Sequence, residues 1–223
     1  MQRSSKLWFL IAVTLATYLS VSVASAATPL PIPQFRHICQ RAIQHAEASG
    51  ALPQDLLTAI SFVESGRWDA EVQAIIAWPW TVTSGGKGNF FADKKTAIAF
   101  VHDLQRKGVR NIDVGCLQVN LRYHPDAFAN LEEAFDPNIN ARYAAQFLGK
   151  LQRDNKSWSE AVRRYHSADP SRGEPYRERV LNFWHKKQRT SAEVYRQSVI
   201  IAYKQRRAEW QRERNLNLIA RSR

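Results

Sequence analysis

Residue types that often carry chemistry are scarce or scattered in this 223-residue chain. Cysteine occurs only twice, at Cys39 and Cys116, so the chain can form at most one internal disulfide, and the alternative is two buried thiols. The six histidines are scattered and no His-Glu-x-x-His sequence is present, which excludes that zinc-hydrolase motif. The sequence therefore predicts no metal and no organic cofactor.

Long apolar runs are also scarce. The apolar run at residues 7–19 is too short to predict a membrane span. It follows Arg3 and Lys6 and precedes the small residues Ala24-Ser25-Ala26. This pattern is typical of a cleaved export signal over residues 1–26, and an uncleaved N-terminal anchor is the alternative. We therefore expect an exported protein without an integral membrane span after cleavage.

Acidic residues are outnumbered by lysine and arginine, 20 to 32, which gives a formal net charge of +12. Removal of the signal with its two basic residues leaves +10, and residues 186–223 alone contribute +8. Such a charge favours anionic partners: cell-wall polymers, lipid headgroups or an acidic protein. Nucleic acid is the usual partner of a basic chain, but export argues against it.

The rest of the sequence predicts a mainly α-helical fold with one small β-hairpin insertion. We expect a linker over residues 27–33, one domain over 34–187 and a basic helical tail over 188–223. Helical spacing and capping residues predict helices at 34–49, 53–64, 93–107, from 136 onward, 157–166, 175–187 and 191–214. The segment 78–91, with glycines at its centre, predicts the hairpin, and 111–120 and 170–175 are expected to be loops.

Glu64 lies on the apolar stripe of the second predicted helix, four residues after Ile60 and seven after Leu57. A carboxylate on the buried edge of a helix is costly. Burial and the negative end of the helix dipole would both raise its pKa. A carboxylic acid that stays protonated near neutral pH is what glycoside cleavage needs as a general acid. The competing interpretation is a helix-end glutamate paired with Arg67, and the stripe alone does not decide between the two.

Four further motifs follow Glu64-Ser65 along the chain. They are Gly115-Cys116-Leu117-Gln118, Asp136-Pro137-Asn138-Ile139, Arg164-Tyr165-His166-Ser167-Ala168 and a tyrosine at Tyr176. In this order the five motifs resemble the soluble lytic transglycosylase domain, over residues 35–180. That family has a lysozyme-like fold, so the resemblance implies a lysozyme-like helical domain that carries the hairpin insertion and a C-terminal helical extension.

The resemblance also implies an activity. The family cleaves the β-1,4 bond between N-acetylmuramic acid and N-acetylglucosamine in periplasmic peptidoglycan, and closes the muramic 6-hydroxyl onto C1 to leave a 1,6-anhydro end. Glu64 would act first as the acid and then as the base. Ser65, Gln118 and Tyr165 would position the acid and the sugar. His166 stands where the family has asparagine, and would substitute for it or lie on the surface.

One departure from the family is the interval between Glu64 and Gly115, which are 51 positions apart, about twice the family's usual spacing. The extra segment carries Trp78 and Trp80, which would either stack on sugar rings or form the core of the hairpin. It is followed by Asp113, which would act as a second acid or would cap loop amides. A second carboxylate facing Glu64 would favour a hydrolytic muramidase over a transglycosylase.

Three expectations depend on the resemblance less directly. We expect Cys39 and Cys116 to bond, because one lies on the first helix and the other beside the proposed active-site loop. The basic tail would pack on the domain, bind the anionic wall or membrane surface, or engage a protein of a secretion, flagellar or pilus assembly. A non-catalytic wall-binding or assembly protein that keeps the fold is the alternative to an enzyme.

Overall fold

The computed structural model describes residues 35–221, so the predicted export signal and linker lie outside the described residues. Its helices are α1 (Ile38–Ser49), α2 (Leu56–Glu64), α3 (Lys94–Arg106), α4 (Leu131–Ala134), α5 (Pro137–Asn155), α6 (Trp158–His166) and α7 (Pro170–Arg221). Its strands are β1 (Gly66–Asp69), β2 (Ala74–Ala77), β3 (Thr81–Ser84), β4 (Lys87–Phe90), β5 (Ile112–Val114) and β6 (Val119–Asn120). This part of the chain is mostly helical with small antiparallel sheets, which confirms the mainly α prediction.

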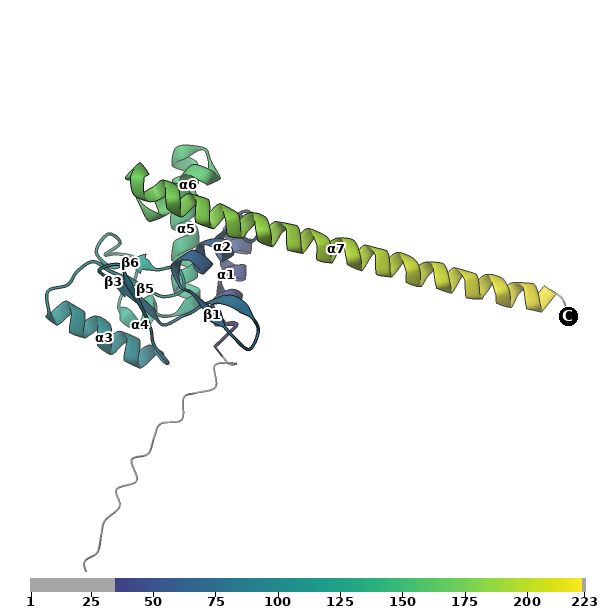
Figure 1. Ribbon diagram of the computed structural model, residues 1–223, viewed down its shortest axis with the longest axis horizontal. Coiled ribbons are helices and arrows are strands. Elements are labelled where there is room, and N and C mark those ends of the chain that lie inside the picture. Colours follow the sequence, from purple (N-terminus) through teal and green to yellow (C-terminus); the bar gives the residue numbers. More distant parts are fainter. Residues whose placement is uncertain (1–34, 222–223) are drawn as a thin grey trace, which may run out of the picture.

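A helical body forms one side of the molecule (Figure 1). In it α5 packs against α1 and α6, and the first part of α7 packs against α2 and α6. The buried side of α5 consists of Asn140, Ala141, Ala144, Ala145, Leu148 and Gly149. Leu148 is the one large apolar side chain in this set, and it is fully buried. Tyr143 and Phe147 lie at the flank of the helix instead, where they line a cavity.

Three helices start within one residue of the predicted positions, and each start has a capping side chain. The Asp93 carboxylate accepts a hydrogen bond from the Thr96 N–H at 2.8 Å, and α3 begins at the next residue. Asp136 caps α5 in the same way, with Pro137 at the first helical position, where its missing N–H costs nothing. The Ser157 hydroxyl caps α6. These three predictions are confirmed because each depends only on neighbours along the chain.

The start of α2 differs from the prediction. The helix begins at Leu56 rather than at Pro53, because Asp55 has a left-handed backbone with φ of 63°. A carboxylate from another helix accepts from buried backbone amides at the start of α2: Glu47 of α1 accepts from the Thr58 N–H at 2.9 Å and from the Asp55 N–H at 3.3 Å. No local signal indicates such a cap, since Glu47 and Thr58 are 11 residues apart.

A four-stranded antiparallel sheet in the order β4-β3-β5-β6 lies beside the helical body. The predicted hairpin is confirmed as β3 and β4, joined by Gly85 and Gly86 with φ of 60° and 77°. Positive φ at both positions matches the tight turn that suits the twist of paired strands. The expected loop at 111–120 is only partly a loop, because β5 and β6 within it extend the same sheet. A second hairpin, β1 and β2, was not predicted.

One row of cross-strand partners runs across this sheet. Gly88 pairs with Thr83, Thr83 with Asp113, and Asp113 with Asn120. Directly paired residues point to the same face of a sheet. Ile112 and Val114, which flank Asp113, are buried on the other face. The row therefore marks the face that is turned away from the hydrophobic core.

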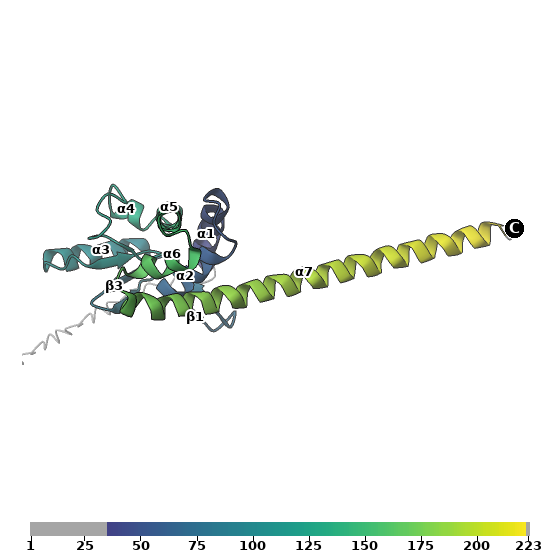
Figure 2. The same ribbon diagram turned by 90° about the horizontal axis from the view of Figure 1, so that it is seen from above.

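α7 is a single helix of 52 residues. The predicted loop at 170–175 and the predicted break between two helices are both wrong, because the helix starts at Pro170 and runs through Pro175. Its early turns pack on the body, and its last hydrogen bonds to the body are those of Trp184 and Gln188 to the Gln54 carbonyl oxygen. Beyond them the helix projects away from the body as an arm (Figures 1 and 2). The predicted domain boundary at 187/188 falls inside this helix.

Candidate active site

A cavity of about 760 Å³ lies where the sheet meets the helical body. The end of α2, the flank of α5, the end of α6 and the start of α7 form one side, and the row Gly88, Thr83, Asp113 and Asn120 forms the other. Of the residues predicted for the site, Glu64, Gln118, Tyr165 and His166 line this cavity. The structure thus brings together four residues that are spread over about half of the sequence.

Glu64 is the last residue of α2 and is partly exposed, at the cavity. Burial raises its pKa from 4.5 to about 8. The neighbouring Tyr176 hydroxyl lowers the pKa, the negative charge of Asp113 raises it further, and Arg179 lowers it slightly. The Tyr176 hydroxyl lies beside this carboxyl without meeting the geometry of a hydrogen bond. With a pKa of about 8, most Glu64 side chains are protonated at pH 7.

Ser65 follows Glu64 but does not line the cavity. It is fully buried, and its hydroxyl donates to the Cys116 carbonyl oxygen at 2.7 Å. The bond ties the end of α2 to the loop between β5 and β6. A disulfide between Cys39 of α1 and Cys116 holds the same loop to the body. The positions of Glu64 and of this loop are therefore fixed to each other.

The loop that follows β5 is held from beneath by Asn140, a fully buried residue of α5. Its Oδ1 accepts from the Leu117 N–H at 3.0 Å, and its Nδ2 donates to the Val114 and Ala134 carbonyl oxygens, each at 3.1 Å. Gly115 is required here, because its φ is +83° and a Cβ would lie 2.5 Å from Asn140 Nδ2. Asn140 directly follows the motif Asp136-Pro137-Asn138-Ile139, and we had assigned it no role. Its position on the buried side of α5, four residues after the cap Asp136, was the available signal.

Gln118 closes this loop with a positive φ of 48°. Its Nε2 donates to the Gly115 and Thr81 carbonyl oxygens at 2.9 and 3.1 Å. Its Oε1 is buried and has no hydrogen-bond partner among the described residues. A buried acceptor without a partner costs free energy that a ligand N–H or O–H can restore. Gln118 is therefore a good candidate for a ligand contact in the cavity.

Tyr165 and His166 reach the cavity from the end of α6. The Tyr165 hydroxyl donates to the Leu117 carbonyl oxygen at 2.9 Å, which adds another tie to the loop. Burial, together with the charges of Glu64 and Asp113, raises the Tyr165 pKa well above 10. The His166 ring stacks on Tyr176 with centroids 4.6 Å apart. Burial, followed by the charges of Arg172 and Arg179, lowers the His166 pKa, which favours the uncharged ring.

Trp78 and Trp80, which we had expected either to stack on sugar rings or to form the core of the hairpin, do not line the cavity. They are 3% and 8% exposed and belong to the core between the sheet and α3. The Trp78 Nε1 donates to the Phe91 carbonyl oxygen at 2.6 Å, and both rings pack edge-to-face with Phe35. Of the two expectations for these rings, the structure places them as the core of the hairpin.

Asp113 lines the cavity from β5 and is the second carboxylate there. Its Oδ1 accepts from Asn120 Nδ2 at 2.8 Å, and burial raises its pKa. We had considered Asp113 chiefly as a loop residue that caps amides. The alternation Ile112-Asp113-Val114, with apolar residues on either side, was the signal that could have placed it on a strand facing away from the core.

The described residues contain no group of three His, Cys, Asp or Glu side chains arranged to hold a metal ion. Within residues 35–221, no helix combines the length and the apolar character that a bilayer crossing requires. Comparison of the chain with protein-family models, with curated proteins and with solved structures finds no match. The function is therefore argued from the cavity itself.

Proposed function

We propose that this protein is an exported lytic transglycosylase that cleaves the β-1,4 bond between N-acetylmuramic acid and N-acetylglucosamine in peptidoglycan. The observation that carries the proposal is Glu64, a carboxyl with a pKa of about 8 in a cavity large enough for sugar rings. The order of the five sequence motifs supports it further, because Glu64, Gln118, Tyr165, His166 and Tyr176 come from four of them and line one cavity. A lysozyme-like fold, with a helical body facing a small sheet, belongs to the same proposal.

The reaction would use Glu64 twice. The protonated carboxyl gives its proton to the glycosidic oxygen while the bond from that oxygen to muramic C1 breaks. The Glu64 carboxylate then takes the proton of the muramic 6-hydroxyl while the oxygen of that hydroxyl bonds to C1. This step leaves a 1,6-anhydro ring and restores the protonated Glu64. No water is consumed. Gln118 Oε1 would accept a hydrogen bond from the substrate, since nothing among the described residues satisfies it.

One observation favours a second candidate, a hydrolytic muramidase. Asp113 lines the same cavity, and its charge acts on Glu64. Hydrolytic glycosidases use a pair of carboxyl groups on either side of the scissile bond, the second as nucleophile or as base for water. With Asp113 in that role, water rather than the 6-hydroxyl would complete the reaction, and the product would carry a reducing end.

Export and a periplasmic location are part of the proposal. The disulfide between Cys39 and Cys116 supports it, because structural disulfides persist in oxidising compartments. The arm of α7 is the proposed contact for a wall or membrane surface, or for a secretion, flagellar or pilus assembly protein. Exposed apolar and aromatic residues on the arm support a contact of this kind: Val194, Tyr195, Val199, Ile200, Ile201, Tyr203 and Trp210.

The test is a digest of purified peptidoglycan sacculi followed by mass analysis of the released fragments. A transglycosylase leaves ends lighter by one water than the reducing ends of a muramidase. Glu64→Gln should lose activity by about 100-fold or more, the contribution typical of general acid catalysis. Glu178→Gln, an exposed change on α7, should not. Reducing ends from the first turnover would select the muramidase, and no digestion by the natural protein would reject both enzymes.

A further inference from the structure

The wall of the cavity formed by α6 and the start of α7 is basic. Arg164 of α6 and Arg172 and Arg179 of α7 line it, and all three side chains are exposed. The charges of Arg172 and Arg179 act on other residues of the cavity. Arg179 lowers the pKa of Glu64, opposing the larger effect of burial. Arg172 and Arg179 both lower the pKa of His166, in the same direction as burial.

Among the residues that the structure describes, two of these three arginines have no carboxylate partner. Arg164 is held by Glu160, with 2.8 Å between Nε and Oε1. No ion pair of the described side chains includes Arg172 or Arg179. Asp169 lies near Arg172, but its Oδ1 accepts from the backbone and the hydroxyl of Ser171, each at 2.9 Å. Two guanidinium groups are therefore available to a ligand in the cavity.

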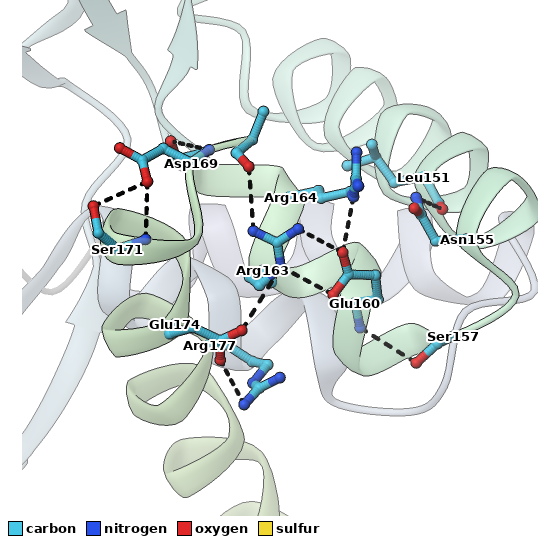
Figure 3. Close-up of polar contacts among 12 residues, drawn as sticks. Leu151, Asn155, Ser157, Glu160, Arg163, Arg164, Asp169, Ser171, Glu174 and Arg177 are labelled. Atoms are coloured by element: carbon cyan, nitrogen blue, oxygen red, sulfur yellow. Dashed lines mark hydrogen bonds and ion pairs between the residues drawn. The ribbon is translucent and has the colours of Figure 1, made fainter.

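The backbone that carries these arginines is fixed by a buried cation, Arg163 (Figure 3). Its guanidinium donates to both Glu160 carboxylate oxygens at 2.6 and 2.9 Å and to the Ala168 carbonyl oxygen at 3.3 Å. Gly173 of α7 packs directly on Arg163, because a Cβ there would lie 2.8 Å from Arg163 Cγ. These contacts hold the turn between α6 and α7, so the backbone that carries the basic wall is fixed without a ligand.

The opposite wall has a different character. Across the cavity the sheet presents Gly88, Thr83, Asp113 and Asn120, which are neutral or acidic. A neutral sugar ring binds through hydroxyl and amide groups and does not require guanidinium groups on one side. Guanidinium groups match carboxylates, to which they donate parallel hydrogen bonds. The asymmetry of the cavity therefore indicates a ligand with negative charge on the side of α7.

We propose that Arg172 and Arg179 bind a carboxylate carried by the lactyl side of N-acetylmuramic acid, so that the enzyme selects strands by their charged substituent. The inference rests on the proposed function, which supplies the glycan strand. The carboxylate has two sources in such strands. In strands stripped of peptide it is the free lactyl group, and in strands that keep the peptide the lactyl group is an amide and the carboxylates belong to the peptide.

The experiment compares three substrates: strands with peptide, strands stripped of peptide by an amidase, and strands with peptide whose carboxylates have been converted to amides. The natural protein, Arg172→Gln with Arg179→Gln, and the control Arg189→Gln, which changes an exposed arginine on the arm, are assayed on each. Binding to the same substrates is measured in a Glu64→Gln background, where cleavage does not interfere.

We expect the double variant to raise KM and weaken binding by about tenfold on one carboxylate-bearing substrate, with a much smaller change in kcat. The effect should shrink as salt is added, since both arginines are exposed. The amidated strands should bind weakly to the natural protein and equally weakly to the double variant. A loss confined to peptide-bearing strands assigns the peptide carboxylates, and a loss confined to stripped strands assigns the lactyl group.

Equal cleavage of all three substrates by the natural protein, or an equal loss on amidated strands in the double variant, would overturn the inference and leave the proposed function intact. Failure of the natural protein to cleave any of the three would reject the proposed function instead. The two failures are therefore distinguishable.

Discussion

Replacing Glu64 with glutamine should stabilise the folded protein at neutral pH, although it removes the proposed acid. Burial raises the pKa of this carboxyl from 4.5 to about 8 in the folded chain. Between pH of about 4.5 and about 8, the folded protein keeps the Glu64 proton while the unfolded chain releases it. The free energy of unfolding is therefore highest below pH of about 4.5 and falls as the pH rises through about 8. Each pH unit in this window changes the free energy of unfolding by about 1.4 kcal/mol, so this group lowers stability by up to about 3 kcal/mol between pH 4.5 and 7.

The assay is urea unfolding of the natural protein, Glu64→Gln and the control Glu178→Gln at about pH 5 and about pH 7. We expect the variant to exceed the natural protein in free energy of unfolding by an amount that grows with pH, while the control follows the natural protein. Partial exposure of Glu64 to the cavity makes about 3 kcal/mol an upper limit. A difference that is the same at both pH values would refute the raised pKa, and with it a neutral-pH acid at this position.

Three further predictions concern the cavity and its supports. Cleavage should fall as the pH rises through about 8, because Glu64 must be protonated to act as the acid. Asp113→Asn should move this fall to lower pH, because the Asp113 charge helps to raise the Glu64 pKa. A pH profile of kcat/KM measures both effects, and an alkaline limb that does not move in the variant would contradict the coupling of the two carboxyl groups. Gly115→Ala should lower the free energy of unfolding by about 2–4 kcal/mol, measured by denaturant, because of its positive φ and the clash with Asn140; unchanged stability would mean that the loop can shift. Replacing Cys39 and Cys116 with serine should cost about 2–5 kcal/mol, and a reductant should lower the melting temperature of the natural protein but not of the variant.

Local chemistry made several elements predictable from the sequence. Asp93, Asp136 and Ser157 mark helix starts because each side chain bonds to an amide two or three residues further on. The hairpin turn at Gly85 and Gly86 is equally local. Each of these features is decided within a few residues, so the sequence pattern is sufficient.

Other parts of the site depend on contacts between distant segments. Asp113 faces the cavity because β5 pairs with β3, about 30 residues earlier, and no local pattern encodes that pairing. Trp78 is buried because Phe35 and α3 pack around it. Pro175 suggested a break in the last helix, but it lies near the helix start, where loss of one backbone bond is tolerated, and packing on α2 and α6 supports the turns around it.

Because α7 is one continuous helix, its length determines both how far the cavity lies from the C-terminal end of the arm and which way the cavity faces. The helix that supplies Tyr176 and Arg179 to the cavity extends beyond Gln188 by residues 189–221, roughly 50 Å at 1.5 Å per residue. If a partner binds the far end of α7, the length of the helix sets the distance between that partner and the cavity. Each residue also rotates the helix by about 100°. Removing about 18 residues therefore shortens the arm by five whole turns and leaves the cavity facing the same direction. Removing about 16 residues would instead leave the cavity facing nearly the opposite direction.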